Sequence, residues 1–141
     1  MQYLKKMKNK VMITILIADK VNLNNRIYPR AVVEKAVSEF NDKYVKSKRA
    51  VVYSSLESDL TKAIGLINEI KLDENEVKID IKWLHPQYEV FNELTNEMCW
   101  TPVGLGTLKN VGDGIYEVEN YELLHVSGVP KTKELEELKY L

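Results

Sequence analysis

The chain holds only two histidines, His85 and His125, and these side chains are the best suited to proton transfer near neutral pH. Ser127 follows His125 by two residues, so a hydroxyl and a base lie close together in the sequence. A serine attacks a carbonyl group only when a base within hydrogen-bonding distance takes its proton. The pair therefore raises the hypothesis of nucleophilic hydrolysis. We favour the alternative that His125 is a partly buried imidazole bonded to neighbouring backbone.

The other polar candidates have structural interpretations that we also favour. His85 directly precedes a proline, where we expect it to end a strand and cap the start of a helix. Ser54 and Ser55 follow a predicted strand and have the composition of a turn. Gly104 and Gly106 have a spacing that could line an oxyanion hole, but Gly-x-Gly within a strand more often marks a bulge or a close backbone approach.

The sequence gives no indication of a metal or redox site. Cys99 is the only cysteine, so no internal disulfide can form, and no Cys or His cluster has ligand spacing. We expect no metal and no cofactor, in a chain suited to a reducing cytoplasm. The longest apolar run, Val11 to Ala18, is far shorter than the ~20 residues needed to span a bilayer, so no membrane contact is expected.

Length and composition indicate one ordinary globular domain. The chain has 141 residues, 45% of them hydrophobic and 29% charged, with a formal net charge of −1. Near-balanced charge argues against direct DNA contact. We expect residues 1–10 to form a basic N-terminal arm, and we interpret its lysines as solvated. The alternative is that the arm binds an acidic partner surface or DNA.

Hydrophobic periodicity predicts an α+β order within a domain of residues 11–130, followed by a C-terminal helix at 131–141. The predicted strands are Val11–Asp19, Ala50–Tyr53, Ala63–Leu72, Val77–Leu84, Val103–Leu108, Ile115–Glu119 and Tyr121–Val126. The predicted helices are Pro29–Lys46, Pro86–Met98 and a short one from Thr132 with Leu135, Leu138 and Leu141 on one side.

An unusual sequence joins the first strand to the long helix. The segment Asn24-Asn-Arg-Ile-Tyr-Pro29, together with the order of elements from about Met12 to Pro130, resembles the prohead proteases of tailed bacteriophages. That resemblance implies a herpesvirus-assemblin type of fold, a closed or nearly closed, mostly antiparallel β core flanked by two or three helices. Arg26 and Tyr28 are expected to hold the turn onto the sheet and need not contact a ligand.

Two motifs of those proteases are altered in this sequence. Their Gly-Glu-Leu-x-His-Pro motif supplies a catalytic histidine, and here Ser58 stands in that place. Their Ser-Ser-Arg-Gly-x-Gly motif holds the nucleophile, and here Thr101-Pro-Val103 replaces its first three residues, whereas Gly104 and Gly106 keep the glycine spacing. Those proteases also have an acidic residue in a late strand, and His125 stands at that position in this sequence. Because the motif histidine and the motif serines are replaced, the resemblance implies a chain without catalytic residues. We therefore predict a pseudo-protease rather than an enzyme.

These observations lead to one favoured function and two alternatives. The favoured function is a non-enzymatic auxiliary or decoration protein, made in the bacterial cytoplasm and carried on the virion. It binds the major capsid protein, which is present in many copies per capsid, and it takes no small-molecule substrate. Weak binding suffices, because contacts that repeat over a symmetric lattice add up to firm attachment. The alternatives are an active prohead serine protease that uses displaced residues, Ser127 or Ser58 with His125, and a transient core or scaffold component of head assembly.

Overall fold

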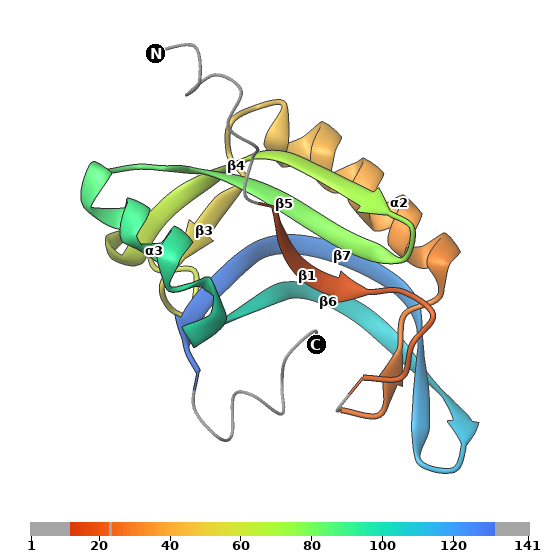
Figure 1. The fold of residues 1–141 in the computed structure, drawn as a ribbon. Coiled ribbons are helices and arrows are strands. Elements are labelled where there is room, and N and C mark those ends of the chain that lie inside the picture. The colour runs from red at the N-terminus through yellow and green to blue at the C-terminus, as the bar shows by residue number, and fades with distance from the viewer. Residues whose placement is uncertain (1–11, 23, 132–141) are drawn as a thin grey trace.

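The computed structural model describes residues 12–22 and 24–131, which fold into one curled sheet with a long helix along its outer side (Figure 1). The strands are β1 (Ile13–Ile17), β2 (Arg26–Ile27), β3 (Val51–Tyr53), β4 (Ala63–Asp73), β5 (Glu76–Trp83), β6 (Met98–Gly112) and β7 (Ile115–Pro130). The α-helices are α2 (Arg30–Phe40), which continues as a π-helical turn over Asn41–Val45, and α3 (Val90–Glu93).

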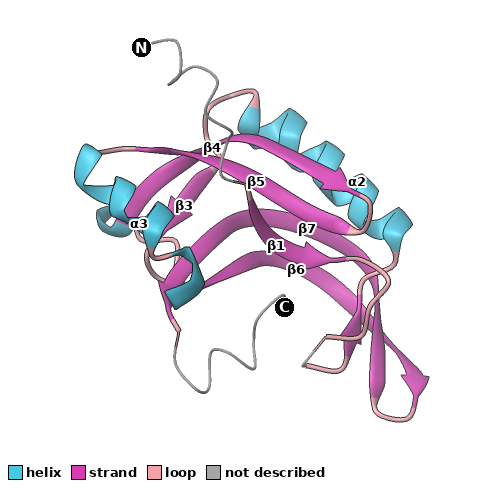
Figure 2. Cartoon of the chain, in the orientation of Figure 1, coloured by secondary structure: helices cyan, strands magenta, loops and turns pink. Residues whose placement is uncertain are grey.

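The sheet is mixed and wraps around a common interior (Figure 2). Antiparallel pairs join β1 to β5, β5 to β4, β4 to β3 and β6 to β7. Two short strands, β2 and β3, pair with β7 in parallel. The α+β expectation is therefore met in outline, whereas the sheet is less uniformly antiparallel than the resemblance implied.

Helix α2 is amphipathic, and its apolar stripe closes one side of the core. Val33, Ala36 and Phe40 recur at helical spacing and are buried against the sheet. Burial of a side chain such as Phe40 stabilises the fold by roughly 1.5–3 kcal/mol. The helix therefore lies in a fixed position beside β7, and its polar face can form one wall of a surface groove.

The segment between Pro86 and Met98 differs from the single helix that the sequence predicts. It consists of a 3-10 turn at Pro86–Glu89, the short helix α3 and a second 3-10 turn at Thr95–Glu97. The Thr95 hydroxyl donates to the carbonyl oxygens of Phe91 and Asn92, each at 3.0 Å, which competes with a regular helical ladder. Met98 already belongs to β6, so that strand begins earlier than predicted.

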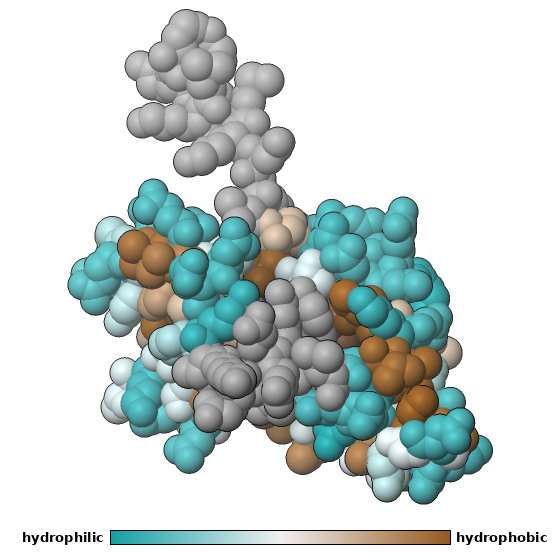
Figure 3. Space-filling view, turned by 60° about the horizontal axis from the view of Figure 1, so that its bottom comes forward, coloured by the Kyte–Doolittle hydropathy of each residue, from teal (hydrophilic) through white to brown (hydrophobic). Residues whose placement is uncertain are grey.

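The last predicted strands form one long hairpin of β6 and β7. Its turn holds Gly112 at φ 101° and Gly114 at φ 74°, values that glycine adopts without a steric penalty. Residues 98–102 of β6 are buried, whereas residues 105–112 are exposed on the part of the hairpin that projects from the molecule (Figure 1). The space-filling view shows apolar side chains gathered on the side of the molecule from which this hairpin projects (Figure 3).

The predicted basic arm at 1–10 and the predicted helix from Thr132 lie outside the described residues. Within the described part of the chain, no helix is long and apolar enough to cross a membrane.

Candidate functional site

A groove lies between the loop after β3 and the middle of the β6–β7 hairpin, and we call it the His125 groove. Its volume is about 550 Å³. Its lining includes Tyr44, Arg49, Tyr53, Ser58, Val103 and His125. The fold thus brings together three places that the resemblance singled out in distant parts of the sequence, the two motif positions Ser58 and Val103 and the late-strand position His125.

His125 is the buried polar side chain of this groove. The residue is only 8% exposed, and its imidazole meets the Tyr53 ring edge-to-face at a centroid distance of 4.9 Å. Burial lowers the pKa of His125, and a hydrogen bond to the Leu56 backbone opposes this in part. Because Nε2 has no partner among the described residues, the bond to Leu56 engages Nδ1. Nε2 itself is buried and has no hydrogen-bond partner among the described residues.

The structure separates the two serines that the alternative hypothesis paired with His125. Ser127 is 0% exposed and lies opposite Thr101 across the hairpin, so a peptide cannot reach its hydroxyl in this conformation. Ser58 is exposed and lines the same groove as His125. Of the two serines, Ser58 is therefore the one that a peptide can reach, although Nε2 of His125 is itself buried and makes no hydrogen bond to it among the described residues.

A second groove adjoins the first, and we call it the Arg26 slot. It measures about 370 Å³ and shares Leu56 and Val103 with the His125 groove. Its lining includes Arg26 and Tyr28 from the signature turn, Thr101 to Gly104 from β6, and Tyr121 from β7. The segments that carry the resemblance therefore surround two neighbouring grooves.

The side chains of the signature turn hold it onto the sheet, as expected. Tyr28 is buried and meets the Tyr121 ring edge-on at a centroid distance of 5.3 Å. Burial raises the pKa of Tyr28, while the Arg26 guanidinium, which donates to its hydroxyl, acts in the opposite direction. The Asn22 carboxamide oxygen accepts from the backbone N–H groups of Asn24 and Arg26, which explains why the turn is rich in asparagine.

Tyr121 also explains the two glycines of the altered nucleophile motif. A Cβ on Gly104 would lie 2.7 Å from the Tyr121 ring, and a Cβ on either glycine would collide with backbone carbonyl groups of β7. The interpretation of Gly104 and Gly106 as a close backbone approach is therefore confirmed. No role for Tyr121 was predicted, although Gly-x-Gly opposite an aromatic residue in a hairpin was an available signal.

The remaining candidates have structural roles. Thr101 is 3% exposed, and its hydroxyl lies 3.4 Å from the Cys99 thiol, so it is closed to a substrate in this conformation. The Ser54 hydroxyl donates to the Lys62 carbonyl oxygen, and the Ser55 hydroxyl accepts from the Glu57 N–H, as expected of turn residues.

His85 lies apart from both grooves. It is exposed, and its carbonyl oxygen accepts from the Tyr88 N–H at the start of the 3-10 turn that follows. The expected cap is thus made by the backbone, because the His85 side chain makes no capping hydrogen bond. In the residues that the structure describes, no group of three or more His, Cys, Asp or Glu side chains could hold a metal ion.

Comparison with known proteins shows a shared fold. No protein-family model and no curated protein matches the sequence. A solved structure, that of the bacteriophage T4 capsid assembly protease gp21, has a similar fold with a TM-score of 0.71. The sequences are 23% identical, and the similarity covers 85% of this chain and 80% of the T4 chain. The chain therefore has a prohead-protease-like fold.

The comparison corrects one sequence-based prediction. We predicted a pseudo-protease that is not an enzyme, but the solved structure with this fold is that of a protease. Replacement of family motifs in the sequence does not show that a site is inactive, and in the described residues a serine and a histidine line one groove. The prediction that the chain is not an enzyme is wrong.

Proposed function

We propose that this protein acts in the head assembly of a tailed bacteriophage as an auxiliary protein that binds the major capsid protein. The observation that carries the proposal is the fold, which matches a capsid assembly protease over most of both chains. A protein of that class must recognise capsid-assembly proteins as polypeptides. In this proposal the protein occupies many equivalent sites on the capsid and is part of the virion.

The proposal needs only modest affinity at each site. Capsid subunits repeat on a symmetric lattice, so the same contact is available in many copies, and contacts between neighbouring bound molecules add to it. The formal net charge of −1 fits a partner recognised through local contacts rather than through a long-range field.

Peptide hydrolysis in the His125 groove is the second candidate function, and one observation favours it. Ser58, which is exposed, and His125 line the same groove. In such a site, once a movement brings the buried Nε2 to Ser58, Nε2 takes the Ser58 proton while Oγ attacks the peptide carbonyl carbon. The imidazolium gives this proton to the leaving amine as the C–N bond breaks, and a water that loses a proton to the same imidazole then hydrolyses the acyl-enzyme. The Nδ1 bond to Leu56 holds the ring in the required tautomer.

One experiment tests both functions. The purified protein is sedimented with mature capsids of the phage that encodes it, the bound copies are counted on gels, and the capsid protein is inspected for fragments. Saturable, stoichiometric binding is expected. Absence of binding to both mature capsids and proheads would overturn the auxiliary function.

The same gels test hydrolysis with matched variants. Fragments of the capsid protein that disappear with Ser58→Ala and with His125→Ala, and that persist with Ser127→Ala, would establish the second function. Intact capsid protein after prolonged incubation with both mature capsids and proheads would argue against it. Circular dichroism of each variant checks that the fold is retained, because His125 and Ser127 are buried.

A further inference from the structure

The projecting half of β6 has an edge that no strand covers. In the described part of the chain, β6 pairs only with β7. The buried half of β6 lies beside β1, and Ile15 and Pro102 line one small cavity there. Residues 105–112, in contrast, are all exposed, and Leu105 is 63% exposed. Unpaired N–H and C=O groups of this half therefore face solvent along the edge opposite β7.

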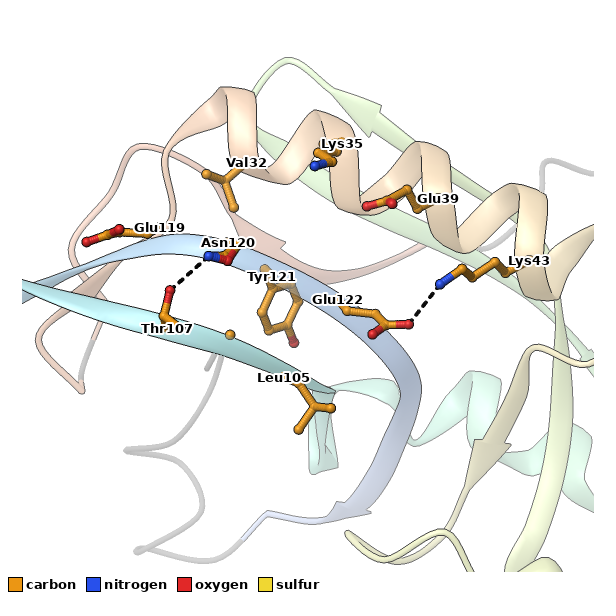
Figure 4. Close-up of a pocket in the computed structure, with 11 residues that line it drawn as sticks. Val32, Lys35, Glu39, Lys43, Leu105, Thr107, Glu119, Asn120, Tyr121 and Glu122 are labelled. Carbon is orange, nitrogen blue, oxygen red and sulfur yellow. Dashed lines mark hydrogen bonds and ion pairs between the residues drawn. The ribbon is translucent and has the colours of Figure 1, made fainter.

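The strand that bears the open edge is held in place from its β7 side. Asn120 Nδ2 on β7 donates to Thr107 Oγ1 on β6 at 3.0 Å (Figure 4). Helix α2 is tied to β7 in turn by the ion pair between Lys43 Nζ and Glu122 Oε2, also at 3.0 Å (Figure 4). Because the edge belongs to a paired strand rather than to a loop, a partner strand would not have to order it on binding.

The segment 104–112 has few of the features that keep strand edges from pairing. Natural proteins usually protect an exposed edge with several charges, with prolines or with a covering loop. Here Lys109 is the only charged residue, and the segment contains no proline. Leu105, Leu108 and Val111 are exposed apolar residues along it. This composition favours addition of another strand through main-chain hydrogen bonds.

The sequence of this segment fits a second copy of itself. Two identical strands pair antiparallel about a two-fold axis, which passes through a residue because alternate residues turn their N–H and C=O groups to opposite edges. With the axis at Leu108, that residue faces its own counterpart, and Leu105 faces Val111 of the second copy. Lys109 then faces Thr107, so each apolar residue meets an apolar residue and the lysine meets a polar one.

The other registers of the same pairing are less favourable. An axis at Lys109 sets two like charges directly opposite each other, which is destabilising. Every remaining position of the axis in 106–110 places Lys109 opposite an apolar residue. Charge and polarity together therefore select the register with Leu108 on the axis.

The two-fold arrangement also leaves room for both molecules. Residues 105–112 lie on the part of the hairpin that projects from the molecule (Figure 1). Antiparallel strands run in opposite directions, so the bodies of the two copies lie beyond opposite ends of the joined hairpins.

We infer that the edge of β6 over residues 104–112 joins two copies of this protein into a symmetric dimer with Leu108 on the two-fold axis. The inference goes beyond the proposed function, because it needs no capsid protein. The contact is small beside a standard protein–protein interface, so monomer and dimer exchange in an equilibrium that depends on concentration.

Sedimentation velocity of the purified protein over a wide range of concentration tests the inference. The wild type is expected to shift from monomer to dimer. Leu108→Asp and Leu108→Lys each remove the apolar pair and set like charges opposite each other, so each is expected to weaken association roughly tenfold. An equimolar mixture of the two variants is expected to restore association, because a carboxylate then faces an ammonium group across the axis, and added salt should weaken this mixed dimer.

A matched control makes one of these changes elsewhere on the surface. Leu60→Asp, at a residue that is 75% exposed on the turn before β4, should associate as the wild type does. Hydrogen–deuterium exchange gives a second readout. Amides within 104–112 that face away from β7 are expected to exchange more slowly at high than at low protein concentration in the wild type, and equally at both in Leu108→Asp.

Three results would overturn the inference while leaving capsid binding as a separate question. The first is a wild type that stays monomeric at every concentration; slower exchange at 104–112 on capsids would then show that a capsid segment occupies this edge instead. The second is association that neither Leu108 variant weakens. The third is a mixture of the two variants that associates no more tightly than either variant alone.

Discussion

His125 is nearly enclosed, and its environment makes stability depend on pH. Burial lowers the pKa of its imidazole below the ordinary value of 6.5. The unfolded chain therefore binds a proton at this residue more readily than the folded protein does, and its contribution to stability is complete above about pH 6.5 and falls as the pH drops below that value. We predict that the urea midpoint decreases between about pH 7.5 and about pH 5.5, and that His125→Gln removes part of this decrease.

The other histidine provides the control for this prediction. His85 is exposed, so His85→Gln should leave the pH dependence of the urea midpoint as in the wild type. Equal decreases in the wild type and in His125→Gln would contradict the assigned burial effect.

The close packing around Gly104 leads to a prediction about stability. A methyl group there meets the Glu122 carbonyl oxygen and the Tyr121 ring, neither of which can move without disturbing the hairpin. Gly104→Ala is therefore expected to lower the free energy of unfolding by about 1–3 kcal/mol, as overpacking usually does. Urea denaturation measures the change. Lys109→Ala on the exposed part of the same strand should have little effect, and a Gly104→Ala protein as stable as this control would contradict the close approach.

At the scale of elements, Arg30 joins the start of α2 to the turn between β4 and β5. Its guanidinium donates to the Glu74 carbonyl oxygen and to Asn75 Oδ1, the latter at 2.9 Å. Arg30→Met is expected to lower the free energy of unfolding by about 1 kcal/mol, because these hydrogen bonds are lost while the methylene packing stays. Lys35→Met, at a helix residue with no such bond to another described residue, is the control in the same denaturation assay. A loss no larger than that of Lys35→Met would contradict the role of Arg30.

Local patterns predicted the elements that have strong periodicity and missed those set by distant contacts. The alternation in β5 and the apolar stripe of α2 were visible in the sequence, since each repeats with the period of its own structure. The strand β2 was not predicted, because Arg26 and Ile27 become a strand only by pairing with Tyr116 and Glu117 far along the chain. The helix predicted from Pro86 is two 3-10 turns with a four-residue helix between them, and apolar periodicity does not distinguish such short turns from one continuous helix.

At the scale of the whole molecule, the resemblance predicted the fold better than it predicted the chemistry. The order of elements sufficed to indicate a prohead-protease-like fold, which the solved T4 structure supports. The groove that both Ser58 and His125 line required the packing of segments that are distant in the sequence. Substitution within motifs could not establish inactivity, because a site is defined by the side chains that converge on it.

The charge of the whole chain gives the last prediction, which concerns DNA. A domain with a formal net charge of −1 releases few counterions on contact with a duplex, so no affinity is expected beyond weak contacts of a few lysines. We predict no shift of a short DNA duplex in a gel at low salt, where such contacts are strongest. The informative variant replaces Lys5, Lys6, Lys8 and Lys10 with alanine. A shift in the wild type that is absent in this variant and weakens with salt would show that the basic arm contacts DNA, and our interpretation of the arm as solvated would then be wrong.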